Sequence, residues 1–299
     1  MFDAVDGELQ ASGRMGGVCY RPNTIRDSLP MLKIPAGSCD THMHIYDDRY
    51  TLDPRWTVAP PNGTTADYKE VQRQLGLERA VVVQPNAYGY DNHCTTDAIR
   101  DLGPQARGIA IIAANIDDSD LLRLHAAGVR GARCYVLPNP FVQWDDVPKI
   151  AGRVAELGWH VQIQLDGRTL PQYDALIRGL PTDFVIDHNG KFLEPVPPTD
   201  PAFQTLLRLL DTGRGWVKLS APYETSKTGA PRYEDVSALA RALAKHNPER
   251  CLWATNWPHP GRNPPPDNVD ILDLLPDWVP DEATRKRILV DNPARLYGF

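Results

Sequence analysis

The chain has 299 residues, of which 42% are hydrophobic and 23% are charged. This composition is typical of a globular protein and excludes collagen-like, coiled-coil and wholly disordered chains. The net charge of −6 argues against a dedicated nucleic-acid binder, which would carry a basic patch. Proline is in excess, at 28 residues, and this predicts many fixed turns and loop ends.

The sequence gives no sign of a membrane segment or of a disulfide framework. No stretch approaches the roughly 20 apolar residues of a membrane-spanning helix, and the acidic, polar start does not resemble a signal peptide. The five cysteines are scattered without a CxxC pair, so a cysteine-based zinc site is not expected. We therefore expect a cytoplasmic protein without nucleic-acid or membrane partners, for which a homodimer is compatible with the sequence.

Short apolar runs alternate with segments of helical spacing along most of the chain. Residues 1–36 lack this pattern and predict an N-terminal extension, and the proline-rich residues 52–63 predict a long loop. Strands are expected at 38–45, 80–84, 108–113, 131–137, 159–165, 183–188, 215–220 and 250–256. Helices are expected at 67–75, 95–102, 119–127, 147–157, 170–180, 201–211, 233–246 and 281–297.

This alternation predicts the α/β class and, within it, a (β/α)8 TIM barrel. Eight apolar strands, each followed by a helix or a long loop, are typical of buried parallel strands that close into a barrel. The alternative is an open doubly wound sheet, but no glycine-rich phosphate-binding turn follows any of the strands. Residues 37–299 are therefore expected to form a single barrel domain.

Catalytic groups of such barrels lie at the carboxyl ends of the strands, where this chain places several polar residues. His42 and His44 end the first strand, and residues two apart on a strand point to the same side. The two imidazoles could converge on a metal or an oxyanion, or simply hydrogen-bond within the structure. His188 ends the sixth strand. Further polar candidates to line a pocket at or beyond strand ends are Gln84, Asn86, Tyr88, Arg130, Arg133, Tyr223 and His259.

Several segments together resemble the amidohydrolase superfamily, and within it the branch of lactone-handling enzymes. That branch includes 2-pyrone-4,6-dicarboxylate lactonase, 4-sulfomuconolactone hydrolase and galactarolactone isomerase. The resemblance runs from about Cys39 to the C-terminus, and its motifs are ordered and spaced as in the family. The matching segments are residues 40–44 (DTHMH), 84–92, 124–133, 185–190 (VIDHNG), 253–260 (WATNWPHP) and 291–297.

One position departs from the family pattern. The last motif usually reads Thr-Asp-Trp-Pro-His, and its Asp is the family's expected general base, whereas this chain has Asn256. An amide does not accept a proton at neutral pH, as a carboxylate does. Either an introduced substitution has inactivated the enzyme, or the natural protein has Asn256 and uses another base.

The resemblance implies an enzyme that opens the ring of a small carboxylated or sulfonated lactone, as in aromatic-compound degradation. It implies that His42, His44 and His188 either hold a divalent metal such as zinc or donate hydrogen bonds to the ring carbonyl themselves. Arg133 and Lys191 match positions that contact the substrate's acid group in the family. A lactone isomerase acting on a sugar-acid lactone and a non-catalytic lactone-binding barrel are the alternatives.

Overall fold

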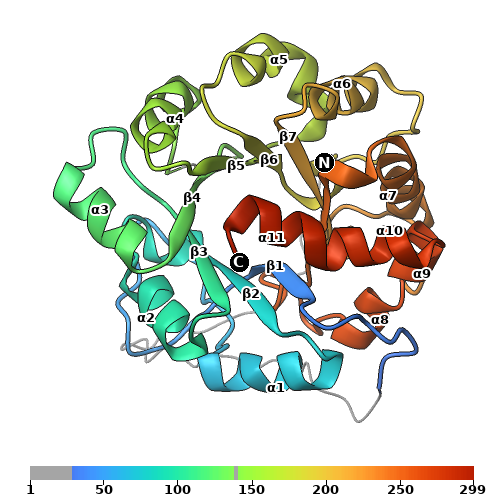
Figure 1. Ribbon diagram of the computed structural model, residues 1–299, viewed down its shortest axis with the longest axis horizontal. Coiled ribbons are helices and arrows are strands. Elements are labelled where there is room, and N and C mark those ends of the chain that lie inside the picture. The colour runs from blue at the N-terminus through green and yellow to red at the C-terminus, as the bar shows by residue number, and fades with distance from the viewer. Residues whose placement is uncertain (1–28, 138–140) are drawn as a thin grey trace, which may run out of the picture.

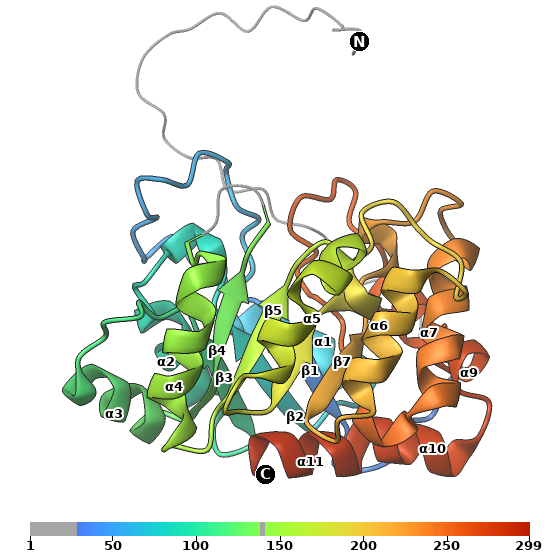
Figure 2. The ribbon, with the colours of Figure 1, turned by 90° about the horizontal axis from the view of Figure 1, so that it is seen from above.

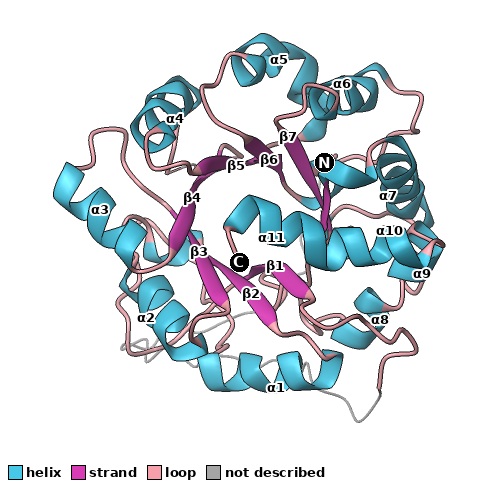
Figure 3. Ribbon diagram, viewed as in Figure 1, coloured by secondary structure: helices cyan, strands magenta, loops and turns pink. Residues whose placement is uncertain are grey.

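The computed structural model describes residues 29–137 and 141–299, and these form the predicted barrel. Eight strands form one sheet, and Figures 1 and 3 show it as a ring surrounded by helices. All neighbouring strands are parallel and follow one another in chain order, so the predicted fold is confirmed. The strands are β1 (Cys39–Met43), β2 (Arg79–Val83), β3 (Ala106–Ala110), β4 (Val129–Tyr135), β5 (His160–Gln164), β6 (Phe184–Ile186), β7 (Gly215–Leu219) and β8 (Cys251–Trp253).

The helices lie outside the ring, and the main ones agree with the predicted segments to within a few residues. They are α1 (Thr65–Leu75), α2 (His93–Leu102), α3 (Asp118–Ala126), α4 (Val147–Ala155), α5 (Leu170–Arg178), α6 (Pro201–Leu210) and α7 (Glu234–His246). The predicted final helix is divided into α10 (Glu282–Lys286), a π-helical turn (Arg287–Asp291) and α11 (Asn292–Tyr297). Two short helices, α8 (Asn268–Leu272) and α9 (Leu275–Trp278), were not predicted, because they are too short to show a periodic pattern.

The two ends of the barrel differ. Figure 2 shows α11 lying across the end where the strands begin, while long loops stand at the other end. Tyr297 of α11 packs with barrel-interior residues such as Val81, Val185 and Trp216, and these side chains fill the lower part of the barrel. Within residues 29–137 and 141–299, the loop end, where the strands finish, is therefore the end of the barrel open to a substrate.

The barrel closes where β1 meets the segment that follows β8. The Asn256 amide donates to the His42 carbonyl at 2.8 Å, and the His44 amide donates to the Trp257 carbonyl at 2.8 Å. The buried Asp40 carboxylate accepts hydrogen bonds from Thr255, through both its amide and its hydroxyl. This carboxylate therefore fixes the position of Asn256 relative to the first-strand histidines.

Residues 1–28 of the predicted N-terminal extension lie outside the described residues. Within 29–36, the amides of Met31 and Leu32 donate to the Asp273 carboxylate, and the Leu32 and Ile34 side chains pack on the core. In the described part of the chain no helix is both long and apolar enough to cross a membrane.

Candidate active site

A cavity of about 340 Å³ opens at the loop end of the barrel. Of the predicted site residues, six line it, and they come from five different strand ends. The lining residues are His44, Tyr46, Trp56, Val58, Ala59, Pro60, Pro61, Asn86, Arg133, Tyr135, Gln164, His188, Lys191, Glu224, Asn256, Pro260 and Gly261. The proline-rich loop at residues 52–63 therefore forms part of the cavity wall.

His44, which lines the cavity, contacts His42, which does not, and their Nε2 atoms are 3.2 Å apart. His44 Nδ1 lies 2.7 Å from the Val83 carbonyl, to which it must donate. Burial and the nearby Arg133 lower the pKa of His44 to about 3, so the ring is neutral at pH 7 and its Nε2 carries no proton. His42 Nε2 is therefore the donor to His44.

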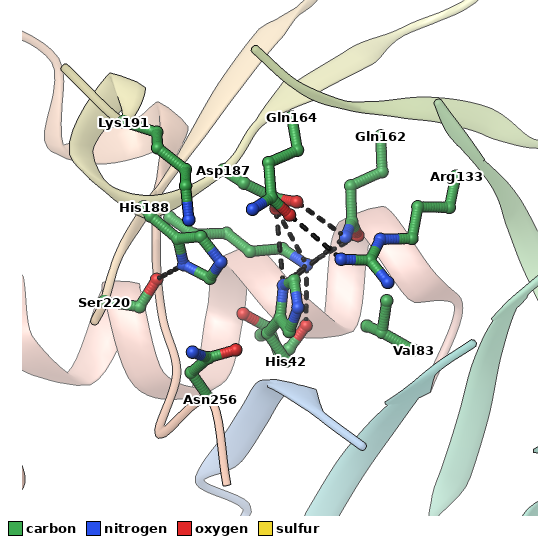
Figure 4. A network of polar contacts seen from close by, with 12 residues as sticks. His42, Val83, Arg133, Gln162, Gln164, Asp187, His188, Lys191, Ser220 and Asn256 are labelled. Atoms are coloured by element: carbon green, nitrogen blue, oxygen red, sulfur yellow. Dashed lines mark hydrogen bonds and ion pairs between the residues drawn. The ribbon is translucent and has the colours of Figure 1, made fainter. Parts of the chain in front are cut away.

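A buried charge network contacts His42 at Nδ1 (Figure 4). Lys218 Nζ donates to the Thr41 carbonyl at 2.9 Å and to Gln162 Oε1 at 2.6 Å, and it lies 3.2 Å from His42 Nδ1. Its charge is compensated by Asp187, whose Oδ1 is 3.6 Å away. Burial lowers the pKa of Lys218 to about 8. Although burial alone would raise the pKa of Asp187, its cationic surroundings hold that pKa well below its ordinary value.

His188 stands beside this network on a tight turn after β6. It and Asn189 adopt positive φ angles of 51° and 56°, which few non-glycine residues adopt. His188 Nδ1 lies 2.8 Å from Ser220 Oγ at the end of β7, and this leaves Nε2 available. A serine hydroxyl can donate or accept, so His188 can present either an N–H or a lone pair at Nε2. Burial lowers the pKa of His188 to about 4.

Arg133 supplies positive charge to the cavity from β4. Its two terminal nitrogens donate to the Gln84 carbonyl at 2.7 Å and to Gln164 Oε1 at 2.9 Å. Its Nε is buried without a hydrogen-bond partner, as is Asn86 Oδ1 nearby in the cavity wall. Because Arg133 lines the cavity, its guanidinium is placed to meet a bound anion.

Glu224 is the residue that sequence reasoning missed. It ends the 3₁₀ turn Pro222–Glu224 after β7 and lines the cavity. Its Oε1 accepts from Asn256 Nδ2 at 3.0 Å, and its Oε2 forms an ion pair with Lys191. Its position just after a predicted barrel strand, next to the predicted Tyr223, could have identified it.

Four other predicted residues, Tyr223, His259, Gln84 and Tyr88, lie near the cavity wall but not in it. Tyr223 and His259 form a hydrogen-bonded pair behind Asn256, with the Tyr223 hydroxyl 2.8 Å from His259 Nδ1 and accepting from Asn256 Nδ2 at 2.9 Å. The Gln84 amide is occupied by the loop carbonyls of Gly89 and Asp91, while the Tyr88 hydroxyl bonds to the backbone of Asp47.

Arg130 is not brought to the site. It lies near the start of β4, at an odd spacing from Arg133, so its side chain leaves the opposite face of the strand. There it donates to the carbonyls of His125 and Val129. His160, at the first position of β5, likewise lies at the closed end and contacts Tyr297.

Comparison with known proteins gives the family of this barrel. The family model described as "Amidohydrolase" matches residues 39–299. The chain belongs to the amidohydrolase family. It is 35% identical to a D-galactarolactone isomerase of Agrobacterium fabrum, over 90% of this chain and 93% of the relative. It is also 35% identical to a 2-pyrone-4,6-dicarboxylate hydrolase of Comamonas testosteroni, with 90% and 93% covered.

A solved structure supports the same assignment. An apo crystal structure of an Agrobacterium tumefaciens protein superposes with a TM-score of 0.84 at 35% identity, covering 90% of this chain and 98% of its own. The predicted resemblance is thus confirmed, and the similar proteins of known activity act on lactones. As an amidohydrolase, the chain carries its candidate site at the strand ends where this fold places catalysis.

Three residues of this chain could together hold a divalent metal. His42, Asp187 and His188 are buried, and one ligand atom from each lies within 4.8 Å of the others. Asp187 Oδ1 is buried and makes no hydrogen bond, and its charge is met by Lys218 Nζ at 3.6 Å and His42 Nδ1 at 3.3 Å. Two nitrogens and one carboxylate oxygen are also a donor set found in catalytic zinc sites. The sequence prediction grouped His44 with the other two histidines, whereas this cluster contains Asp187.

Proposed function

We propose that this amidohydrolase hydrolyses a small lactone that carries a carboxylate or sulfonate group. The observation that carries the proposal is the buried Arg133, which lines a cavity of about 340 Å³ and is held by two hydrogen bonds. A guanidinium held in place by two hydrogen bonds binds a planar anion with good geometry. The resemblance to lactone-acting enzymes over most of the chain supports the same class of substrate.

His188 would act on the ring carbonyl. It lines the cavity and is neutral at pH 7, so it can contact a carbonyl oxygen without repelling the cationic Arg133. His44 has no N–H for this contact, because its Nδ1 donates to the Val83 carbonyl and its Nε2 accepts from His42. When His188 presents an N–H at Nε2, it can donate to the oxygen that becomes negative as water attacks. Ser220 fixes the ring for this task through its contact with Nδ1.

In the alternative to this direct contact, a divalent metal such as zinc is held by His42, Asp187 and His188, and His188 Nε2 is then a ligand and not a hydrogen-bond donor. Such an ion would lower the pKa of a bound water and polarise the carbonyl. Lys218 and Gln162 contact His42 Nδ1 and Asp187, so they would orient these two ligands.

Lactone isomerisation is a second candidate, because the D-galactarolactone isomerase resembles this chain as closely as the hydrolase does. In isomerisation a hydroxyl of the substrate takes the place of water as the nucleophile. The same anion site and carbonyl site would serve both reactions.

The proposal is tested by comparing anionic lactones with uncharged ones. We expect 2-pyrone-4,6-dicarboxylate or a sugar-acid lactone to be consumed with a kcat/KM at least about 10-fold above that of its methyl ester, because a charged hydrogen bond contributes about 1.5–3 kcal/mol. Arg133→Met should remove this preference, whereas Arg123→Met, an exposed variant on α3, should retain it. Equal rates for the acid and the ester in the unaltered enzyme would contradict the proposal.

A further inference from the structure

Glu224 lies where the missing carboxylate of this site is needed. Among the described residues that line the cavity, it is the only carboxylate. Its side chain is 13% exposed, so it is reachable from the cavity but shielded from bulk water. Its Oε1 is 3.0 Å from Asn256 Nδ2, which brings a carboxylate next to the position that lacks one.

The contact also explains the amide at position 256. Since a carboxylate only accepts, Asn256 must turn its NH₂ group toward Glu224, and a second donation from the same nitrogen reaches the Tyr223 hydroxyl. An Asp at position 256 would place two carboxylates about 3 Å apart. Two such groups cannot both ionise easily, so one would be protonated at neutral pH. Asn256 and Glu224 are thus complementary.

We propose that Glu224 is the general base of this enzyme and takes over the proton transfer that Asn256 cannot perform. The inference rests on the proposed lactone chemistry. It favours the explanation that Asn256 belongs with another base over the explanation that it inactivates the enzyme.

Glu224 would carry one proton through both steps of the hydrolysis. Glu224 takes one proton from water while the water oxygen forms a bond to the lactone carbonyl carbon, and the carbonyl π electrons move to its oxygen. Collapse of this tetrahedral species breaks the ring C–O bond, and the leaving oxygen receives the proton from Glu224. The products are a carboxylic acid and a hydroxyl (or enol) on one open chain, with Glu224 again ionised.

Lys191 links this base to the charge of the substrate. Burial alone would raise the pKa of Glu224, but Lys191 and other nearby groups lower it to about 2. Lys191 also lines the cavity, so an acid group of the substrate competes with Glu224 for its ammonium. When the ammonium turns to the substrate, the Glu224 carboxylate loses its counter-charge and becomes more basic. An anionic substrate would thereby activate the base.

The experiment exchanges the acid and the amide between positions 224 and 256. Glu224→Gln keeps the shape of the side chain, and we expect it to lower kcat about 10²–10⁴-fold with little change in KM. Combining Glu224→Gln with Asn256→Asp restores one carboxylate and one amide at hydrogen-bonding distance, and should recover at least about 10-fold of kcat. Asn256→Asp alone should not exceed the unaltered enzyme. Glu194→Gln, which removes an exposed carboxylate paired with Lys227, is the matched control and should leave kcat unchanged.

Three results separate the possibilities. If Glu224→Gln retains kcat within about threefold, Glu224 is not the base, and the lactone function stands. If Asn256→Asp alone raises kcat 100-fold or more, position 256 is the base site. The assignment of Glu224 as the base is then overturned, while the lactone function stands. If neither the unaltered protein nor Asn256→Asp consumes any anionic lactone, the proposed function itself fails, and the base assignment fails with it.

Discussion

The buried pair of Lys218 and Asp187 makes the protein's stability sensitive to the loss of either partner alone. Both side chains are fully buried, and the ammonium donates to Thr41 and Gln162 as well as neutralising Asp187. Lys218→Met removes the cation but retains most of the chain volume. Asp187 is then left as a buried charge with fewer compensating groups.

Breaking a buried ion pair by removing one partner costs about 3–5 kcal/mol, because the remaining charge is uncompensated. Two carbonyl acceptors lose their donor as well, so we expect the upper part of that range. At about 2–4 °C per kcal/mol for proteins of about 150–250 residues, the thermal midpoint would fall by roughly 6–20 °C. Adding Asp187→Asn to Lys218→Met removes the orphaned charge and should recover part of the loss.

The assay is urea unfolding followed by circular dichroism, with thermal unfolding as a second measurement. Lys245→Met, on the exposed side of α7, is the control and should change the free energy of unfolding by less than about 0.5 kcal/mol. A loss of less than about 1 kcal/mol in Lys218→Met would refute the argument. So would a double variant that is less stable than the single one.

Further outcomes follow from the site. Burial lowers the pKa values of His44, His188 and His259 to between about 3 and 4, below the ordinary value near 6.5 of the unfolded chain. Between pH 6.5 and 4 the unfolded chain therefore binds protons that the folded chain does not, so the free energy of unfolding should fall as the pH falls through this window. Urea titrations at pH 7, 5 and 4 measure this, and a constant value would show that the rings are not held neutral. Arg133→Lys should lower kcat/KM for an anionic lactone about 10–100-fold, since a lysine cannot hold both hydrogen bonds and still present a donor; an unchanged value would remove Arg133 from substrate binding. Ser220→Ala should lower kcat/KM about 10-fold by releasing His188, and steady-state kinetics on the same lactone would show whether this orientation matters.

The fold could be predicted from the sequence because its strands are buried on both faces and its helices on one face. These two kinds of burial leave different hydrophobic patterns along the chain. Runs such as Ala80–Val83 read as buried parallel strands, and the order of strands and helices left few topologies open. The short helices α8 and α9 were missed because a few residues between prolines carry no periodic signal. His42, His44, His188 and Arg133 could be predicted as site residues because each lies toward the carboxyl end of a predicted strand, and parallel strands all finish at the same end of the barrel.

The partners of those residues were not visible in the sequence. Glu224 reaches Asn256 across 32 residues of chain, and Lys218 reaches His42 across 176, so only the closed barrel brings them together. Arg130 shows the reverse case. It shares a strand with Arg133, but the alternation of side chains along that strand sends it to the other face. The motifs therefore predicted which strand ends form the site, but not which residue of each strand points into it.

The fate of the solvent oxygen tests the central claim of lactone hydrolysis most directly. The enzyme is incubated with an anionic lactone in ¹⁸O-labelled water, and the product is analysed by mass spectrometry before appreciable uncatalysed opening. We predict one ¹⁸O atom in the carboxyl group of a ring-opened product. A product of unchanged mass that carries no label and differs only in the position of the ring would contradict hydrolysis and establish isomerisation.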